Sequence, residues 1–138
     1  MSEPCPFCEI VAGRAFAQMV AEWDDVVAFR PLNAVTREHT LVVPRTHVRD
    51  FASDPEVSAA TMRRAAELMR GTSRHLNLIT SRGAAATQSV FHLHLHLVPR
   101  TEGDGLALPW HDAGGSEVGQ DQPSPCPQRD QLAAEEEQ

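Results

Sequence analysis

The chain has 138 residues, a formal net charge of −7 and three cysteines. Its length suits one domain with one core, and no apolar run approaches the roughly 18 residues of a membrane-spanning helix. Residues 112–138 carry seven acids and one arginine, whereas residues 1–111 carry 11 arginines and 12 acids and are nearly neutral. This balance argues against a basic nucleic-acid-binding surface and is compatible with a local site for an anion.

The composition also suggests a compartment and a domain boundary. The odd number of cysteines gives no disulfide framework, and the first residues lack the basic and apolar regions of a secretory signal. We therefore expect a cytoplasmic protein. Residues 113–138 are rich in Gly, Ser, Gln, Pro and Glu, so we expect a folded domain over residues 1–112 and a disordered tail over 113–138.

The motif Cys5-Pro-Phe-Cys8 lies near the start of the chain. Such a C-x-x-C pair can hold one side of a zinc ion or form a redox dithiol. No second C-x-x-C follows, so histidines would have to supply the remaining zinc ligands. Helical signals cover residues 7–12, and two short strands are expected over 20–22 and 26–29, around a turn at 23–25.

The middle of the chain predicts a strand, a helix and a second strand. The apolar, β-branched stretch 39–44 predicts a strand that ends at its proline. Ser53-Asp-Pro-Glu56 has the spacing of a capping box with proline in the first turn, so a helix should begin there and end at Gly71. A strand is expected over 76–80, followed by a loop of small residues over 81–89 that could approach phosphate oxygens closely.

Three of the seven histidines, His92, His94 and His96, alternate with leucines in the stretch 88–100. Side chains in a strand alternate between faces, so a strand here would place three imidazoles on one face and three leucines on the other. The leucine face can pack against a core. Three adjacent imidazoles are costly to bury unless each has a partner, which makes them candidates for chemistry.

Three kinds of chemistry would explain these histidines. The triad could bind zinc, completed by His39 or His47, because alternate strand positions lie about 6.6 Å apart. A neutral imidazole could act as a nucleophile toward phosphorus, with neighbouring donors stabilising the phosphoryl oxygens. A pH switch is the third reading, since imidazole titrates near neutrality, but no other feature of the sequence supports it. The residues alone leave the first two open.

His-Leu-His-Leu-His-Leu-Val, residues 92–98, resembles the signature of the histidine-triad (HIT) family of nucleotide hydrolases and transferases. Further blocks resemble the family in the expected order, and the similarity covers roughly residues 4–111. These blocks are Cys5-Pro-Phe-Cys8 with Ile10 and Gly13, Val27-Ala-Phe29, His39-Thr-Leu-Val-Val-Pro44 with His47, and Gln88-Ser-Val90. The C-x-x-C pair is similar to that of a Hint-like bacterial branch.

The resemblance implies an α+β fold with a five-stranded antiparallel sheet, one long helix and one short helix. It also implies a homodimer with a ten-stranded sheet and a nucleotide substrate. From the charge balance and the lack of a long apolar run, we expect no nucleic-acid or membrane partner. The expected reaction is hydrolysis or transfer at the α-phosphate of nucleoside phosphoramidates or related nucleotides, through a nucleotidyl-histidine intermediate. The alternatives are a dinucleoside polyphosphate hydrolase or phosphorylase, and a nucleotide-binding scaffold with little turnover.

The resemblance also assigns roles to individual residues. His94 would be the nucleophile, oriented by the backbone carbonyl of His92, and His39 and His96 would complete the catalytic set. Nucleotide contacts would come from Leu32, His39, Ser81, Gln88, Ser89 and His96. A structural zinc ion, not required for catalysis, would be bound by Cys5, Cys8, His47 and His92.

Three positions depart from the family pattern. Pro31 stands where an acidic residue commonly binds the ribose hydroxyls, and proline cannot make those hydrogen bonds. Ser81 replaces a common Asn or Gln near the scissile phosphate and has a shorter reach. Thr87 replaces a usual glycine in the phosphate loop, where its methyl group could narrow the approach. The nucleophile is therefore better supported by the sequence than the substrate.

Overall fold

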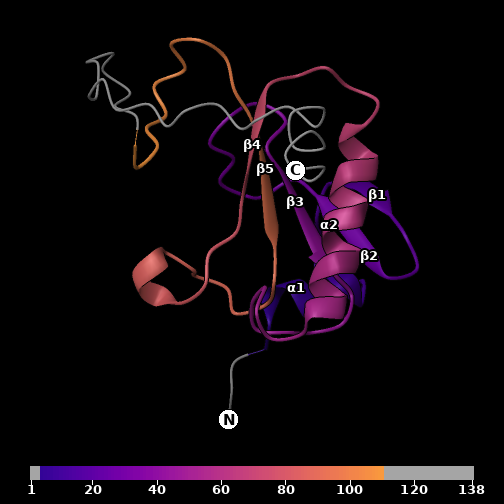
Figure 1. The fold of residues 1–138 in the computed structure, drawn as a ribbon. Helices are drawn as coiled ribbons and strands as arrows, with labels where there is room; N and C mark the ends of the chain where they lie inside the picture. The colour runs from indigo at the N-terminus through magenta and orange to yellow at the C-terminus, as the bar shows by residue number, and fades with distance from the viewer. Residues whose placement is uncertain (1–3, 111–138) are drawn as a thin grey trace, which may run out of the picture. The chain divides into compact units, whose positions relative to one another are not determined.

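The computed structural model describes residues 4–110 (Figure 1). The chain divides into two compact units, Met1–Thr101 and Glu102–Gln138. All the helices and strands described below belong to the first unit. The expected domain end at residue 112 and the expected disordered tail over 113–138 lie outside the described residues. Across residues 4–110, no helix has the length and apolar content that a membrane span requires.

The first unit is built on a five-stranded antiparallel sheet with the order β1-β2-β3-β5-β4. The strands are β1 Met19–Glu22, β2 Val26–Phe29, β3 Thr40–Pro44, β4 Leu76–Ile79 and β5 Leu95–Pro99. The helices are α1 Pro6–Val11, α2 Pro55–Met69 and the short 3-10 turn η1 Ala84–Ala86. The expected α+β fold, with one long and one short helix, is confirmed.

The two faces of the sheet bury different layers. Helix α2 lies along one face, against β2, β3 and β5 (Figure 1). The cluster on that face contains Val26, Ala28, Val42, Ala65, Leu93, Leu95 and Leu97. On the other face, Phe7 of α1 packs with Val27, Phe29, Leu41 and Val43. Alternation along β2 and β3 thus sends one set of side chains toward α2 and the next toward α1.

Helix α2 begins one residue later than the capping-box spacing suggests. The N-cap is Asp54, whose carboxylate accepts hydrogen bonds from the backbone of Glu56 and Val57. The Ser53 hydroxyl instead accepts from the backbone N–H of Asp50 at 3.1 Å. The prediction of Ser53 as the cap was wrong, because Asp caps as well as Ser and Asp54 places Pro55 at the first helical position.

The histidine stretch is a strand only in its second half. Strand β5 begins at Leu95, and its pairing with β3 runs from Leu95 to Leu97. The backbone N–H of Leu93 donates to the carbonyl of Val48 at 2.8 Å instead of entering the ladder. The prediction of a continuous strand from His92 was therefore wrong. The separation of leucines from histidines is nevertheless kept, with Leu93, Leu95 and Leu97 all in the core beneath α2.

Candidate active site and metal centre

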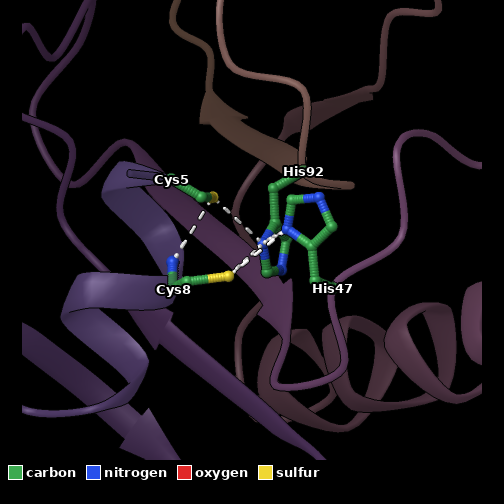
Figure 2. A group of neighbouring side chains, drawn as sticks. All are labelled: Cys5, Cys8, His47 and His92. Carbon is green, nitrogen blue, oxygen red and sulfur yellow. Dashed lines mark hydrogen bonds between the residues drawn. The ribbon is translucent and has the colours of Figure 1, made fainter. Parts of the chain in front are cut away.

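Two cysteines and two histidines form a compact cluster at the N-terminal end of the triad (Figure 2). One side-chain donor atom from each of Cys5, Cys8, His47 and His92 lies within 4.8 Å of all the others. Sγ of Cys5 is 3.4 Å from Nδ1 of His92, and Sγ of Cys8 is 3.3 Å from Nδ1 of His47. The two Nδ1 atoms are 3.1 Å apart.

These separations fit a tetrahedral zinc site. With Zn–S near 2.3 Å and Zn–N near 2.0–2.1 Å, tetrahedral geometry places sulfur about 3.5 Å from nitrogen and the two nitrogens about 3.3 Å apart. Two thiolates and two imidazoles are also a common donor set for structural zinc. The expected ligand set, Cys5, Cys8, His47 and His92, is therefore brought together by the structure, and it fits the ion.

Local structure explains why these side chains converge. Cys5 is the N-cap of α1, and its sulfur accepts a hydrogen bond from the backbone N–H of Cys8. The ring of His92 is fully buried and its Nε2 donates to the carbonyl of Pro44 at 2.8 Å, which leaves Nδ1 unprotonated toward the thiols. Burial also lowers the pKa of His92 and favours the neutral form that a metal ligand needs.

His94 is positioned by the residue two places before it. Its Nδ1 donates to the backbone carbonyl of His92 at 2.8 Å, so the neutral ring carries its lone pair on Nε2. Burial lowers the pKa of His94, and the residue is only 9% exposed. The hydroxyl of Thr80 donates to the His94 carbonyl at 2.8 Å and fixes the backbone. The neutral ring is thus oriented as a nucleophile would be.

His39 and His96 form a hydrogen-bonded pair beside His94. Nε2 of His39 lies 3.0 Å from Nδ1 of His96, and the backbone N–H of Val35 donates to Nδ1 of His39 at 3.2 Å. Both ring nitrogens of the buried His39 are therefore engaged within the protein. Burial, reinforced by His94 and His39, lowers the pKa of His96 to about 4, so its ring is neutral near pH 7.

A cavity of about 460 Å³ opens beside these rings. Several expected site residues line it, namely His39, Ser81, Gln88, Ser89, His94 and His96, together with Pro31, Asn33 and Thr87. Among the residues that the structure describes, no Asp, Glu, Lys or Arg lines this cavity. Leu32 is 97% exposed and lies outside the lining. The cavity has the size of a small-molecule site, and its polar groups are histidines, hydroxyls and amides.

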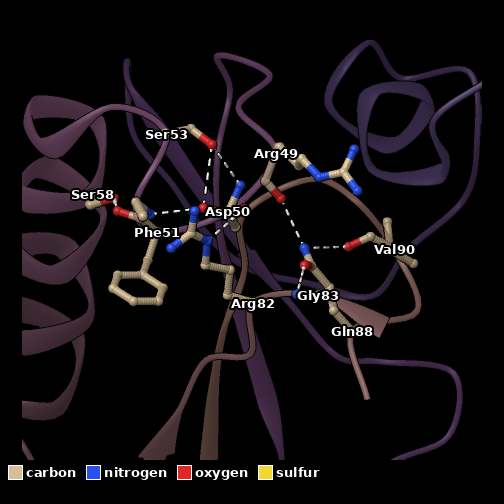
Figure 3. Close-up of polar contacts among 10 residues, drawn as sticks. Arg49, Asp50, Phe51, Ser53, Ser58, Arg82, Gly83, Gln88 and Val90 are labelled. Carbon is tan, nitrogen blue, oxygen red and sulfur yellow. Dashed lines mark hydrogen bonds and ion pairs between the residues drawn. The ribbon is translucent and has the colours of Figure 1, made fainter. Parts of the chain in front are cut away.

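The loop from Gly83 to Gln88 is closed by the side chain of Gln88 (Figure 3). The Gln88 amide accepts from the Gly83 N–H at 2.8 Å and donates to the carbonyls of Arg49 and Val90 at 2.8 and 3.1 Å. The residue is 5% exposed. The amide is thus occupied by backbone groups, which suits a residue that shapes the loop.

The carboxylate of the buried Asp50 lies near Arg82, the residue before this loop (Figure 3). It accepts from the backbone N–H of Ala52 at 2.9 Å and lies 3.7 Å from Nε of Arg82. Sequence reasoning missed Asp50, because an acid in an otherwise irregular segment carries no motif. Its one local signal was Ser53 three residues later, which the capping-box reading assigned to the helix.

Comparison with known proteins agrees with this geometry. The family model for the HIT domain matches residues 13–103. The chain is 34% identical over 116 residues to "Protein hit" of Bacillus subtilis, which covers 79% of this chain and 80% of that protein. It is 30% identical over 112 residues to "Adenylylsulfatase HINT3" of Arabidopsis thaliana, covering 77% of this chain and 57% of that protein.

Solved structures show the same fold. A HIT family protein from Bacillus anthracis superposes with a TM-score of 0.71 at 34% identity, covering 81% of this chain and 84% of that one. A zinc-bound histidine triad family protein from Mycobacterium smegmatis gives 0.66 at 35% identity, covering 78% and 81%. On its sequence match, its five-stranded sheet and its ordered histidine triad, the chain belongs to the HIT family.

Proposed function

We propose that the protein hydrolyses or transfers nucleotides at the α-phosphate, with nucleoside phosphoramidates or related nucleotides as substrates. The observation that carries this proposal is the arrangement of His94. Its Nδ1 is held by the His92 carbonyl at 2.8 Å, and its ring lines the cavity of about 460 Å³. A neutral imidazole fixed in this way has a single lone pair available for attack.

The reaction would proceed in two displacements. Nε2 of His94 attacks the α-phosphorus, a nitrogen–phosphorus bond forms, and the bond to the leaving group breaks as that group takes up a proton from solvent. A water oxygen then attacks the same phosphorus, the nitrogen–phosphorus bond breaks, and its electron pair returns to Nε2. The nucleoside monophosphate leaves, and the water proton passes to solvent. Splitting one difficult step into two is the advantage of the covalent intermediate.

The remaining cavity residues would bind the substrate. His96 and the hydroxyls of Ser81 and Ser89, which line the cavity, would donate to phosphoryl oxygens. Pro31 has no donor for a ribose hydroxyl, but the exposed amide of Asn33 lines the same cavity. Leu32, from the same loop, supplies an exposed apolar side chain for the base. The nucleotide would thus lie with its phosphate at the histidines and its sugar at this loop.

The Cys/His cluster would hold a structural zinc ion. The four protein donors would fill a tetrahedral shell and leave no coordination position for water. When bound, the ion would supply a cross-link between α1, the segment after β3 and the segment before β5. The chain's own residues would therefore carry the reaction.

A homodimer is proposed on the exposed edge of the sheet. Strand β4 is an outer strand, and Leu78 and Ile79 on it are 37% and 39% exposed. Pairing two copies along this edge would cover an open strand, which soluble proteins otherwise protect. Native mass spectrometry of the wild type against Leu78→Pro tests this arrangement. Because the N–H of Arg100 donates to the opposite His75 carbonyl, Leu78 and Leu97 form a non-hydrogen-bonded pair, so the N–H that proline removes faces the open edge.

Single-turnover kinetics test the enzymatic proposal. Adenosine 5′-phosphoramidate, diadenosine tetraphosphate and adenylyl sulfate should be compared under identical conditions. The third belongs in the set because a relative bears the name adenylylsulfatase. We expect the wild type to release AMP from the phosphoramidate. His94→Ala should lose that activity by at least about a thousandfold. The matched control His75→Ala, which alters an exposed histidine outside the cavity lining, should lose none.

The alternatives give distinct results. Cleavage of the dinucleotide alone would keep the His94 mechanism and identify a dinucleoside polyphosphate hydrolase or phosphorylase. Nucleotide binding without turnover of any substrate would identify a scaffold. Turnover that survives His94→Ala would contradict the proposal.

A further inference from the structure

Two hydrogen bonds in series connect a backbone amide to the ring of His96. The Val35 N–H donates to Nδ1 of His39 at 3.2 Å, and Nε2 of His39 lies 3.0 Å from Nδ1 of His96. A backbone N–H can only donate, so Nδ1 of His39 must be the unprotonated nitrogen. A neutral His39 then carries its proton on Nε2 and donates it to His96. Nδ1 of His96 therefore accepts, and the proton of neutral His96 resides on Nε2.

The two neighbouring triad rings consequently have opposite tautomers. His94 holds its proton on Nδ1, bound to the His92 carbonyl, and keeps a lone pair on Nε2. His96, whose ring centroid is 4.9 Å from that of His94, keeps an N–H on Nε2. Both rings line the cavity. One ring therefore has the character of a nucleophile, and the other has the character of a donor.

We propose that the backbone amide of Val35 fixes the tautomer of His96 through His39, so that His96 meets its ligand as a neutral hydrogen-bond donor. His39 is then a positioning residue that acts through His96. The tautomer assignment stands on the hydrogen bonds alone. The identity of the acceptor, an oxygen of the transferred phosphoryl group, rests on the proposed function.

The same arrangement resists protonation of His96. A second proton on His96 would have to enter Nδ1, where it would face the N–H of His39 across 3.0 Å. His39 cannot relieve this conflict by moving its proton to Nδ1, because the Val35 N–H already points there. Two further ionisable groups disfavour a positive charge on the pair. His94 lowers the pKa of His96, and Arg30 lowers the pKa of His39. The lowered pKa of His96, about 4, agrees with this geometry.

Through these hydrogen bonds, the tautomer of His96 in the cavity depends on the conformation of the loop between β2 and β3. That loop contributes Pro31, Asn33 and Val35 to the lining. A change of loop conformation that withdraws the Val35 amide would free Nδ1 of His39 and let both tautomers of His96 form. The side chain of Val35 has no part in the chain of hydrogen bonds and is 56% exposed, so the backbone donor can be tested separately from the side chain.

Two-bond ¹H–¹⁵N NMR of the full chain with labelled histidine measures the tautomers directly. In the wild type at pH 7 we expect the Nε2–H form for His39 and His96, and the Nδ1–H form for His94. Val35→Ala keeps the amide and should preserve this pattern. Val35→Pro removes it and should give His96 a mixture of tautomers. Turnover should then fall by about tenfold, as for the loss of one hydrogen bond to a phosphoryl oxygen.

Two substitutions at His39 keep the test decisive if Val35→Pro does not fold. In His39→Gln, the amide can accept from Val35 and donate to His96, so His96 should stay in the Nε2–H form. In His39→Glu, the carboxylate can only accept, so His96 should move its proton to Nδ1. An Nδ1–H form of His96 in the wild type, or one unchanged form across His39→Glu and Val35→Pro, would overturn the inference. Expected tautomers without turnover of any nucleotide would instead refute the proposed function.

Discussion

The carbonyl oxygen of His92 accepts a hydrogen bond of 2.8 Å from Nδ1 of His94, while the ring of the same His92 lies in the Cys/His cluster, 3.4 Å from Sγ of Cys5. One residue therefore belongs to the candidate metal centre through its side chain and to the candidate active site through its backbone. A disturbance of the cluster should change the orientation of the proposed nucleophile as well as the stability of the fold.

Loss of the Cys/His cluster should reduce both the stability of the fold and the single-turnover activity. In Cys8→Ser one strong ligand is lost, and we expect zinc content to fall from about one ion per chain to near zero. Because four ligands join three segments, the melting temperature should drop by about 10 °C or more. Single-turnover activity measured below the lower melting temperature should also fall, since the His92 carbonyl is no longer fixed. Elemental analysis and calorimetry provide the measurements.

Cys126→Ser is the matched control for this prediction. It removes a thiol that lies outside the described residues and is not one of the four expected ligands, so zinc content and melting temperature should be unchanged. A purified wild type without zinc, as stable as the protein with zinc added, would argue against a structural metal site.

Gln88 should matter for loop geometry more than for direct ligand contact. Gln88→Ala leaves the partly buried Gly83 N–H and the Arg49 and Val90 carbonyls without their partner, so we expect the free energy of unfolding to fall by about 1–3 kcal/mol. Urea titration measures this change. The control is Gln18→Ala, at an exposed side chain on the first unit, which should stay within about 0.5 kcal/mol. An unchanged stability with a raised KM would indicate a direct ligand contact instead.

Thr87 and Gly83 give a reciprocal test of strain in the same loop. Thr87 is a β-branched residue at φ 70°, where a side chain is disfavoured by about 1–2 kcal/mol. Thr87→Gly should therefore stabilise the folded protein. The net gain should be roughly 1 kcal/mol at most, because glycine also raises the conformational entropy of the unfolded chain. The substitution should also lower KM if the threonine methyl narrows the cavity.

Gly83→Ala should have the opposite effect. Gly83 has φ 93° and ψ 159°, a region almost restricted to glycine, yet an added Cβ would meet no atom within 4 Å. A loss of about 1–3 kcal/mol would thus come from backbone strain alone. Thermal unfolding of both variants with the wild type provides the comparison, and equal melting temperatures for all three would show that the loop is not strained.

The sequence predicted the strands well where the pattern of apolar residues agreed with the residues that end a strand. The apolar runs that became β2 and β3, and the proline that ends β3, placed those strands to within one residue. The failures came where a tertiary contact decided the outcome. His92 alternates with leucines as a strand residue would, but the Leu93 N–H binds Val48 instead of a neighbouring strand, and no local pattern encodes that partner.

The candidate site was predictable in its members but not in its connections. A resemblance to the family brought Cys5, Cys8, His47 and His92 together before any distance was known, and they do converge. The Val35 amide and the Asp50 carboxylate could not be found in this way, because their contributions depend on backbone geometry and burial. Any residue can supply a backbone N–H, so the sequence carries no signal for it.

Removal of the acidic tail tests the expected domain boundary. A chain that ends at residue 112 retains all the helices and strands of the first unit, so its circular dichroism and its single-turnover rate should match those of the full chain. The counterpart is a chain that ends at residue 99, which removes Arg100 and its backbone hydrogen bond of 2.8 Å to the His75 carbonyl and should be less stable. Loss of fold or activity in the chain that ends at residue 112 would mean that part of the domain lies beyond that residue.

Acid should destabilise the fold through the paired histidines. Burial lowers the pKa of His39, and burial with its histidine neighbours lowers that of His96 to about 4, whereas both titrate near about 6.5 when unfolded. Between these values the unfolded chain binds more protons than the folded one, so the free energy of unfolding falls as pH decreases from about 6.5 toward 4. Each histidine contributes a slope of at most about 1.4 kcal/mol per pH unit.

Urea titrations at several pH values between 7 and 4.5 measure that slope. His96→Asn removes one titrating group and should flatten the dependence relative to the wild type, while His75→Ala, at an exposed histidine, should leave it unchanged. Acid also protonates the ligands of the Cys/His cluster, but all three proteins share that cluster, so the difference between them isolates His96. Parallel slopes for His96→Asn and the wild type would mean that His96 has an ordinary pKa in the folded protein, and that the donor state fixed by Val35 and His39 does not protect it from protonation.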